Sequence, residues 1–421
     1  MKRRQFVVTV AIGSLLLAGC AQGSQTATGD ADSVSFVGDE AAVLPQIEAA
    51  DAVIEEETGL AFESRTVQST ENYQQVIRSS LSSDSTTDLV KWWNGYRVQE
   101  LARGGGLADL TEVWEEAVDN GWVNDETRDS FSYEGQVYGI PFDKAYWTVY
   151  YNKNVFEDLG LDVPSDWDEF ESNAQAIADA DITPFFATIE PGWTAFIWFE
   201  EFVSKLDPDF YVDLTEGDAS YTDDVAQEAM EIWADFYERG FFTPADTPWD
   251  NEVPMLESET VAMTVAGSWQ NGAFAASDLT EDDYGSFVLP TVEPDTEQTV
   301  IAESGIITAA ERGANLDGAR EWLGQLLNPD AQAALVAESR GLSANPEVIS
   351  DDPVLSSVQD EVLSAEMREL TRYWEASPPA LIEGNVQDLA AFMADPAPEN
   401  IDSTLQAMQT RAETEWASWE E

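Results

Sequence analysis

Carboxylates and indoles are the side chains through which this chain of 421 residues could do chemistry, because it holds 82 Asp and Glu and 15 Trp. It has no His, which excludes Ser-His-Asp and Cys-His nucleophilic machinery and every imidazole metal site. Its single Cys, Cys20, also excludes an internal disulfide and thiolate zinc clusters. Carboxylate chemistry, as in a secreted glycoside hydrolase, or binding without chemistry remains. With so many acidic residues, a pair of carboxylates is easily found by chance, so such a pair favours neither a hydrolase nor a binding protein.

The balance of charged residues argues against binding to polyanions. With 82 acidic against 19 basic residues the formal net charge is −63, so the surface should repel nucleic acid and anionic lipid headgroups. Hydrophobic residues make up 43% of the chain, which is enough for a large core and argues against disorder. The acidic coat fits a protein kept hydrated in high external salt, or an ordinary acidic secreted protein.

No cofactor and no metal site are predicted. Asp207, Asp209 and Asp213 are spaced loosely like a calcium loop. Tyr211 lies between them and no glycine follows correctly, so we interpret the spacing as chance. The three glycines at 104–106 end an expected helix and no GKS or GKT follows, which indicates a turn rather than a phosphate loop.

Aromatic side chains beside polar ones, at the ends of expected strands or in loops, are the candidates for ligand binding. Aromatic rings stack on the C–H faces of a pyranose, and carboxylate, amide and Arg groups bond its hydroxyls. Trp93 and Asn94 end an expected strand and are favoured over Trp92, because neighbouring strand residues face opposite sides. Asp39 and Glu40 follow an earlier strand, where a solvated acidic loop is an equal alternative. Further candidates are Trp193, Trp249 and Trp374 in or beside loops, Glu303 and Gly305 at a strand entry, and the rare cation Arg340.

Strands and helices alternate at the start of the chain, as in a mostly parallel sheet covered by helices on both faces. Strands are expected at 34–37, 60–67 and 88–93, with helices between them at 44–58 and 71–81. The length suggests two domains, and the absence of a fixed-period repeat argues against a repetitive surface adhesin. Three Trp residues fall on expected helices at core spacing and are assigned to packing: Trp114, Trp233 and Trp322.

The N-terminus has the form of a targeting segment. Lys2, Arg3 and Arg4 precede the apolar stretch 6–18, which is too short to span a bilayer comfortably. It ends in Leu-Ala-Gly-Cys at Cys20, which resembles the lipobox of bacterial lipoproteins; a transmembrane anchor with a chance cysteine is the alternative. We therefore expect a lipoprotein signal peptide at 1–19, lipidation of Cys20, a flexible tether at 20–33, and an extracytoplasmic protein anchored to the cell membrane.

Several motifs resemble one family. Tyr-Gly-Ile-Pro-Phe-Asp at 138–143 is followed by Tyr-Tyr-Asn-Lys at 150–153 and by Trp-Asp-Glu-Phe at 167–170. Ala-Met-Thr at 262–264 precedes Gly-Ser-Trp, and Gly-Leu-Ser-Ala-Asn at 341–345 has serine where proline is usual. From about Val34 onward the chain resembles the extracellular solute-binding proteins of ABC importers, in the carbohydrate-binding branch that includes maltose-binding protein.

The resemblance implies an α/β, two-lobed periplasmic-binding-protein fold of type II, maltose-binding-like, with the ligand in a cleft between the lobes. By the family pattern, 34–145 and 268–327 would form lobe I, and 146–267 and 328–421 lobe II. The resemblance also adds candidate ligand contacts at the two crossings between lobes: Asp143, Tyr146, Trp147, Gly267, Ser268 and Trp269. It implies a non-catalytic, monomeric protein that binds a sugar or oligosaccharide and delivers it to the transmembrane subunits of an ABC permease. The secreted glycoside hydrolase is the alternative.

Overall fold

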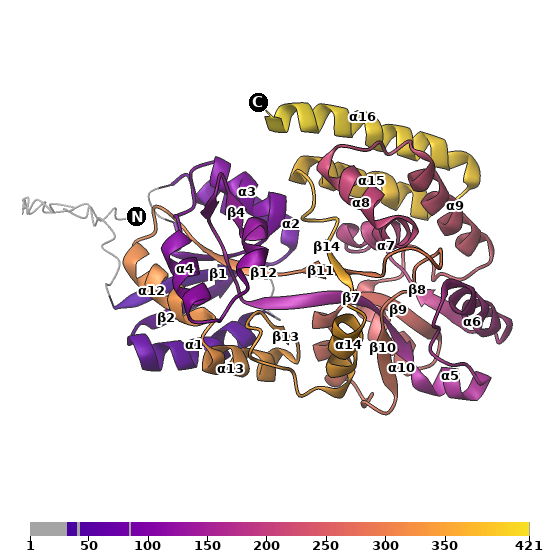
Figure 1. The fold of residues 1–421 in the computed structure, drawn as a ribbon, viewed down its shortest axis with the longest axis horizontal. Coiled ribbons are helices and arrows are strands. Elements are labelled where there is room, and N and C mark those ends of the chain that lie inside the picture. The colour runs from indigo at the N-terminus through magenta and orange to yellow at the C-terminus, as the bar shows by residue number, and fades with distance from the viewer. Residues whose placement is uncertain (1–31, 40–42, 84–85, 421) are drawn as a thin grey trace, which may run out of the picture.

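The computed structural model describes residues 32–39, 43–83 and 86–420, which form two large sheets that lie side by side (Figure 1). A third, two-stranded sheet is formed by β4 (Ser132–Tyr133) and β5 (Gln136–Val137). The first sheet has five strands, of which β1, β2 and β3 run parallel and β12 runs antiparallel to both β3 and β6. Its strand order is β2 (Ala61–Thr66), β1 (Ser33–Gly38), β3 (Leu89–Trp93), β12 (Gly305–Ala309) and β6 (Ile140–Pro141). The strands expected near the start of the chain are therefore confirmed.

Helices pack on this first sheet as the apolar spacing predicts. Four helices lie between its early strands or follow them: α1 (Leu44–Thr58), α2 (Thr70–Ser80), α3 (Gly95–Arg103) and α4 (Thr111–Asp119). Two more, α12 (Leu316–Leu326) and α13 (Pro329–Ser339), pack against α1. We call the first sheet and these six helices the first lobe.

The second sheet has seven strands and is organised around β7 (Asp143–Asn152), the long strand that reaches from one lobe toward the other in Figure 1. Four strands pair with β7 and all run antiparallel to it. They are β9 (Val261–Gly267), β10 (Tyr284–Phe287), β11 (Thr299–Glu303) and β13 (Leu342–Ser343). The sheet is completed by β8 (Thr183–Phe186) beside β9 and β14 (Arg368–Thr371) beside β11.

The helices from α5 to α11 and from α14 to α16 form, with the second sheet, the second lobe. The central one is α7 (Ile197–Leu206), which is buried from Ile197 to Lys205. The others are α5 (Lys153–Leu159), α6 (Trp167–Asp179), α8 (Pro208–Glu216), α9 (Asp224–Glu238), α10 (Glu252–Glu257), α11 (Asn271–Ala275), α14 (Pro353–Ser364), α15 (Pro379–Ala394) and α16 (Ile401–Glu420). No helix in the described part of the chain is both long and apolar enough to cross a membrane.

The chain changes sheet at Phe142, between β6 and β7, and at Ser304, between β11 and β12. The third passage lies between α13 and β13, and β13 pairs with the first two residues of β7, so all three passages meet at the start of that strand. We expected lobe boundaries at 145, 268 and 327. The packing of strands and helices in the structure does not follow the last two of these boundaries. Strands β10 and β11 pair with β7 in the second sheet, and α13 packs along α1 in the first lobe. A Gly-Ser-Trp turn marks a strand end, but the residues of the turn do not determine which sheet the next strand joins.

The core assignments made for helical tryptophans are confirmed. Trp114, Trp233 and Trp322 have 0% of their surface exposed. Trp92 is also 0% exposed and Trp93 8%, so both members of that pair are buried and Trp93 is the more exposed of the two. Packing of these large rings fixes the strands whose ends carry the candidate ligand-binding residues.

Candidate ligand-binding site

Four indoles of the second lobe form a cluster at the ends of its strands. Trp147 lies on β7, and Trp193, Trp249 and Trp269 lie on short 3₁₀ turns. Their ring centroids are 5.6 to 6.5 Å apart, mostly with inclined or edge-on planes. Trp147 is buried and the other three are half-buried, so the cluster forms a partly accessible aromatic wall. The sequence predicted each of the four as a ligand contact, and the fold brings them together.

Glu303, the last residue of β11, holds two of these indoles. Its Oε1 accepts a hydrogen bond from Nε1 of Trp147 at 3.1 Å and from Nε1 of Trp269 at 2.7 Å. Its Oε2 lies 2.6 Å from Nη1 of Arg372, and its side chain is 10% exposed. Three donors therefore occupy both carboxylate oxygens. Glu303 was predicted to contact a ligand, and in the structure it positions the two indoles.

Arg372 and Glu375 complete this buried network and were not predicted from the sequence. Nε of Arg372 donates to Oε2 of Glu375 at 2.8 Å, and a second guanidinium nitrogen bonds the other oxygen. The guanidinium carbon of Arg372 is 5.5 Å from the centroid of the Trp147 ring, within cation–π range. Burial raises the pKa of Glu375, although Arg372 acts against this. The available signal was that Arg372 is one of only 19 basic residues and lies two positions before Trp374.

Asp143 and Gly305 face each other where the chain changes sheet. Oδ1 of Asp143 accepts a hydrogen bond from the Gly305 amide at 2.6 Å. A Cβ on Gly305 would come within 2.9 Å of that oxygen and closer still to the Phe142 ring, so only glycine fits. Burial raises the pKa of Asp143 to about 6, and the negative charge of Glu303 contributes to the shift. The hydrogen bond from the Gly305 amide lowers this pKa, as do the positive charges of Lys91 in the first lobe and Arg372 in the second.

The first lobe contributes a second group of polar and aromatic residues. Nζ of Lys91 lies 3.2 Å from Oδ1 of Asp39 and 4.1 Å from the centroid of the Trp93 ring. Trp93 packs edge-on against Trp92 and pairs in register with Gly305, next to the strand change. Asn94 is 6% exposed, and its Oδ1 is buried without a hydrogen-bond partner. Lys91 was not predicted; it lies two residues before Trp93 on the same face of β3.

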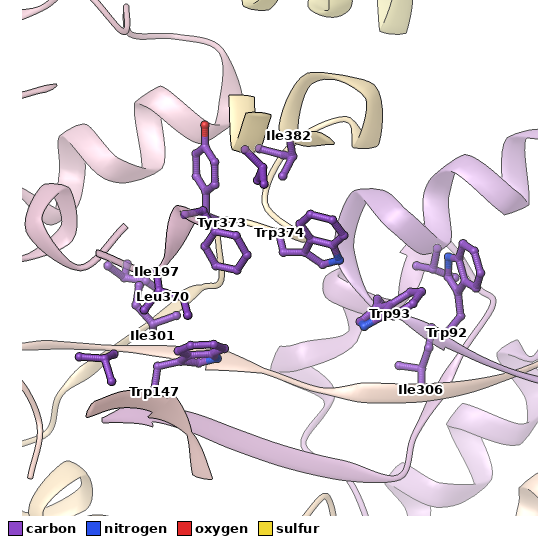
Figure 2. Packing of buried hydrophobic residues seen from close by; sticks show 14 of the residues in the cluster. Trp92, Trp93, Trp147, Ile197, Ile301, Ile306, Leu370, Tyr373, Trp374 and Ile382 are labelled. Atoms are coloured by element: carbon purple, nitrogen blue, oxygen red, sulfur yellow. The ribbon is translucent and has the colours of Figure 1, made fainter. Parts of the chain in front are cut away.

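Trp374 lies between the lobes. Its ring stacks on Phe196 of the second lobe at 6.0 Å, and the guanidinium of Arg97 on α3 of the first lobe lies 3.7 Å from its centroid. Arg97 is fully buried and its Nε donates to the Trp374 carbonyl at 3.0 Å. Figure 2 shows Trp93, Trp147 and Trp374 pointing toward the same region from β3, β7 and the segment after β14.

The remaining candidates lie behind the aromatic wall, away from it or outside the described residues. Tyr146 points to the face of β7 opposite Trp147, where its hydroxyl donates to Glu369 at 2.8 Å. Oγ of Ser268 accepts from the Tyr146 amide at 3.2 Å, and the Trp269 ring lies directly against Gly267. Arg340 ends α13 in a left-handed conformation and is exposed. Glu40 and Cys20 fall outside the described residues.

The charges of the site favour an uncharged ligand over an anion. Four carboxyl groups lie where the lobes meet, against three cations: Asp39, Asp143, Glu303 and Glu375 against Lys91, Arg97 and Arg372. An anionic ligand would meet this excess of negative charge in a partly buried site, where repulsion is screened poorly. Indole faces beside hydrogen-bonding groups suit polyhydroxylated rings. Within the described residues, no group of three or more acidic or thiol side chains is arranged to hold a metal ion.

Comparisons with known proteins find relatives among extracellular solute-binding proteins. The family model described as bacterial extracellular solute-binding protein matches residues 42–333. An ABC transporter extracellular-binding protein of Pyrococcus horikoshii is 22% identical over 77% of this chain and 71% of its own length. The diacetylchitobiose-binding protein DasA of Streptomyces coelicolor is 24% identical over 68% of this chain and 67% of its own.

Solved structures show the same fold. The bacterial solute receptor AcbH superposes with a TM-score of 0.83 at 20% identity, covering 91% of this chain and 98% of that one. A chitin oligosaccharide binding protein gives 0.79 at 18% identity over 90% and 98%. The expected two-lobed α/β fold of the maltose-binding type is thereby confirmed. Since the family model spans well over half of the sequence, the chain belongs to the bacterial extracellular solute-binding proteins.

Proposed function

We propose that this protein is the substrate-binding component of an ABC importer and that it binds a neutral carbohydrate between its two lobes. The observation that carries the proposal is the aromatic wall, in which one carboxylate, Glu303, fixes the indoles of Trp147 and Trp269. Glu303 is also one residue from Ser304, where the chain passes to the other lobe. A sugar stacked on this wall would lie beside the first-lobe residues Lys91 and Trp93.

The distribution of these groups over two lobes supports a closing mechanism. A ligand favours the closed form only to the extent that it binds that form more tightly than the open one. Stacking on the second-lobe indoles alone would bind both forms equally. Hydrogen bonds to Asp39 and Asn94 of the first lobe would form only on closure, and Asn94 Oδ1 is buried without a partner. The closed shape is what a permease would recognise.

The carbohydrate class rests on chemistry and on the relatives. Diacetylchitobiose is bound by the Streptomyces relative, and β-D-galactopyranose is the stated substrate of AcbH. Both are neutral sugars, which agrees with the excess of carboxylates in this site. No family match favours the glycoside hydrolase, and a reducing-sugar release assay on oligosaccharides distinguishes the two functions.

The test of the proposal is a thermal-shift screen over neutral mono-, di- and trisaccharides, N-acetylated sugars and anionic sugar acids, in low and in molar salt. A ligand present at about 100 times its Kd stabilises the folded state by about 2.7 kcal/mol, which gives a clear rise in melting temperature. We expect neutral sugars to raise it and sugar acids to leave it unchanged. Stabilisation by sugar acids alone, or by no saccharide, would contradict the proposal.

We further propose that the protein is held at the membrane by lipid on Cys20, after removal of 1–19. The lipobox-like sequence and the apolar stretch before it support this. A Cys20→Ser variant should appear in the medium instead of the membrane fraction. If it stays membrane-bound to the same extent as the unaltered protein, the anchor is different.

A further inference from the structure

The end of the C-terminal helix contacts the first lobe. The rings of Trp416 and Trp419 on α16 each lie 5.4 Å from the Tyr96 ring on α3. The guanidinium carbon of Arg103, also on α3, lies 4.6 Å from the centroid of Trp419, and its Nη1 donates to the Trp419 carbonyl at 2.7 Å. We call these four residues the aromatic latch.

The two sides of the aromatic latch belong to different lobes. Helix α3 follows β3 and packs on β4 (Ser132–Tyr133) of the first lobe. Helix α16 packs on α15 and α9 along the outside of the second lobe and ends beside the first (Figure 1). Trp416 is seated on Gly217 of the second lobe, where φ is 88° and a Cβ would come within 2.7 Å of the indole nitrogen. Thus α16 is fixed to one lobe while its tip contacts the other.

The aromatic latch is displaced from the points where the chain passes between the lobes. Helix α3 begins two residues after Trp93, which pairs with Gly305 at the strand change. Arg103 is at the far end of α3, and at 1.5 Å per residue its backbone is about 12 Å along the axis from Gly95. A rotation about the strand changes therefore moves Arg103 further than it moves Trp93. Opening of the lobes would separate Arg103 from Trp419.

The contact has the character of a reversible interface rather than of a core. Arg103 is exposed, and Tyr96 and Trp419 are half-buried. A cavity of about 320 Å³ remains beside them. It is lined by Glu100, Arg103, Pro378, Pro379, Ala380, Glu415, Ser418 and Trp419. Surfaces that pack loosely in this way can part without exposing a large buried apolar area.

We propose that the aromatic latch favours the closed arrangement of the lobes before any ligand is bound, and that its residues set ligand affinity without touching the ligand. The contacts between α3 and α16 are lost on opening, so they add to the stability of the closed form alone. The apparent affinity for a ligand falls when a smaller fraction of the molecules is in the form that binds it tightly. Weakening the aromatic latch should therefore raise the apparent Kd. The effect should appear mainly in faster release of the ligand.

The test measures the distance between the lobes without ligand. Cys20→Ser removes the only thiol of the full-length chain, and spin labels are then placed at two exposed sites, Glu112→Cys on α4 and Glu228→Cys on α9. Double electron–electron resonance spectroscopy then measures the distribution of distances between the two spin labels. The free energy of an exposed cation–π contact corresponds to about a two- to fivefold change in an equilibrium constant. Arg103→Ala or Trp419→Ala should therefore lower the ratio of closed to open molecules by that factor.

Arg239→Ala is the matched control, because Arg239 lies 4.3 Å from the Phe241 ring entirely within the second lobe. It should leave the distribution unchanged, and circular dichroism checks that each variant folds. The proposal is overturned if Arg103→Ala and Trp419→Ala both keep the distribution of the unaltered protein. It is also overturned if that protein without ligand shows no closed population. Since no ligand is added, either result is independent of which solute the protein binds.

Discussion

Replacing Glu303 by Gln tests whether the carboxylate that holds two indoles is needed for binding. Glu303 accepts from Trp147 and Trp269 with one oxygen and pairs with Arg372 through the other. Gln has a single acceptor oxygen. It can keep the two indole donors and turn its amide NH₂ toward Arg372, or keep Arg372 and turn the NH₂ toward the indoles. In either orientation donors face donors, so the side chain has to move.

The expected size follows from the contacts that are lost. A hydrogen bond to a charged group contributes about 1.5–3 kcal/mol, and the site is only 10% exposed, so screening by water is weak. Arg372 retains Glu375, which limits the loss to one such contact. We expect the free energy of unfolding to fall by about 1.5–3 kcal/mol. Ligand binding should weaken by at least roughly tenfold, which corresponds to about 1.4 kcal/mol.

The assay is calorimetric titration with the sugar found in the screen, together with thermal unfolding followed by circular dichroism. Asp51→Asn is the matched control. Oδ1 of Asp51 accepts from Nε1 of Trp322 at 2.8 Å in the first lobe, so the same substitution is made at a carboxylate that holds an indole away from the site. Burial raises the pKa of Asp51 to about 6, and a neutral amide should cost little there.

Two results would refute the reasoning. If Glu303→Gln lowers stability while the affinity stays within a factor of two, Trp147 and Trp269 are not the platform for the ligand. If Asp51→Asn weakens binding as much as Glu303→Gln does, the effect reports general loss of stability rather than positioning of the indoles.

Three further predictions follow from the buried rings, the raised pKa values and the surface charge. Trp193→Ala should weaken sugar binding by about 1–3 kcal/mol, whereas Trp322→Ala should lower stability by about 3–5 kcal/mol and leave the affinity of the folded protein unchanged, as titration and melting curves will show. Burial raises the pKa of Asp51 and Asp143 to about 6 and of Glu201 and Glu252 to about 7. In the folded state these groups keep protons that the unfolded chain releases near pH 4. The free energy of unfolding measured in urea should therefore fall as the pH rises from about 4 to about 7 and then level off. A rise in the free energy of unfolding through that window would contradict this. With a net charge of −63, the melting temperature should rise between 0.01 M and 1 M salt, as the Debye length falls from about 30 Å to about 3 Å, and a flat response would exclude self-repulsion as a determinant of stability.

Local signals predicted the elements and the aromatic wall but could not predict the pairing of distant strands. Apolar runs bounded by helical spacing gave the early strands, and the two-residue period of a strand predicted that Trp92 and Trp93 face opposite sides. The same alternation on β7 separates Tyr146 from Trp147, although both were predicted as contacts. The second lobe gains β10 and β11 through pairing with a strand more than a hundred residues earlier in the chain, and such long-range contacts leave no local mark.

The ionic network was missed for a related reason. Arg372, Glu375 and Lys91 become part of the site through tertiary contacts, and the sequence does not show which distant partner each of these charges meets. In a chain with few basic residues, however, a buried Arg is costly unless it is paired. The scarcity of cations beside abundant carboxylates was therefore the one sequence feature that favoured a role for Arg372 and Lys91.

The strand order of the first sheet affects how the chain can be made. β12 lies between β3 and β6 but is the last of the five strands along the chain. Until Ala309 has been synthesised, β3 has a free edge that carries Trp92 and Trp93, and all of 143–303 must be made first. An unpaired edge with aromatic residues promotes aggregation. If synthesis or export stops before Ala309, the first sheet therefore lacks β12 and β3 keeps an unpaired edge. Chaperones would have to cover that edge until β12 is added.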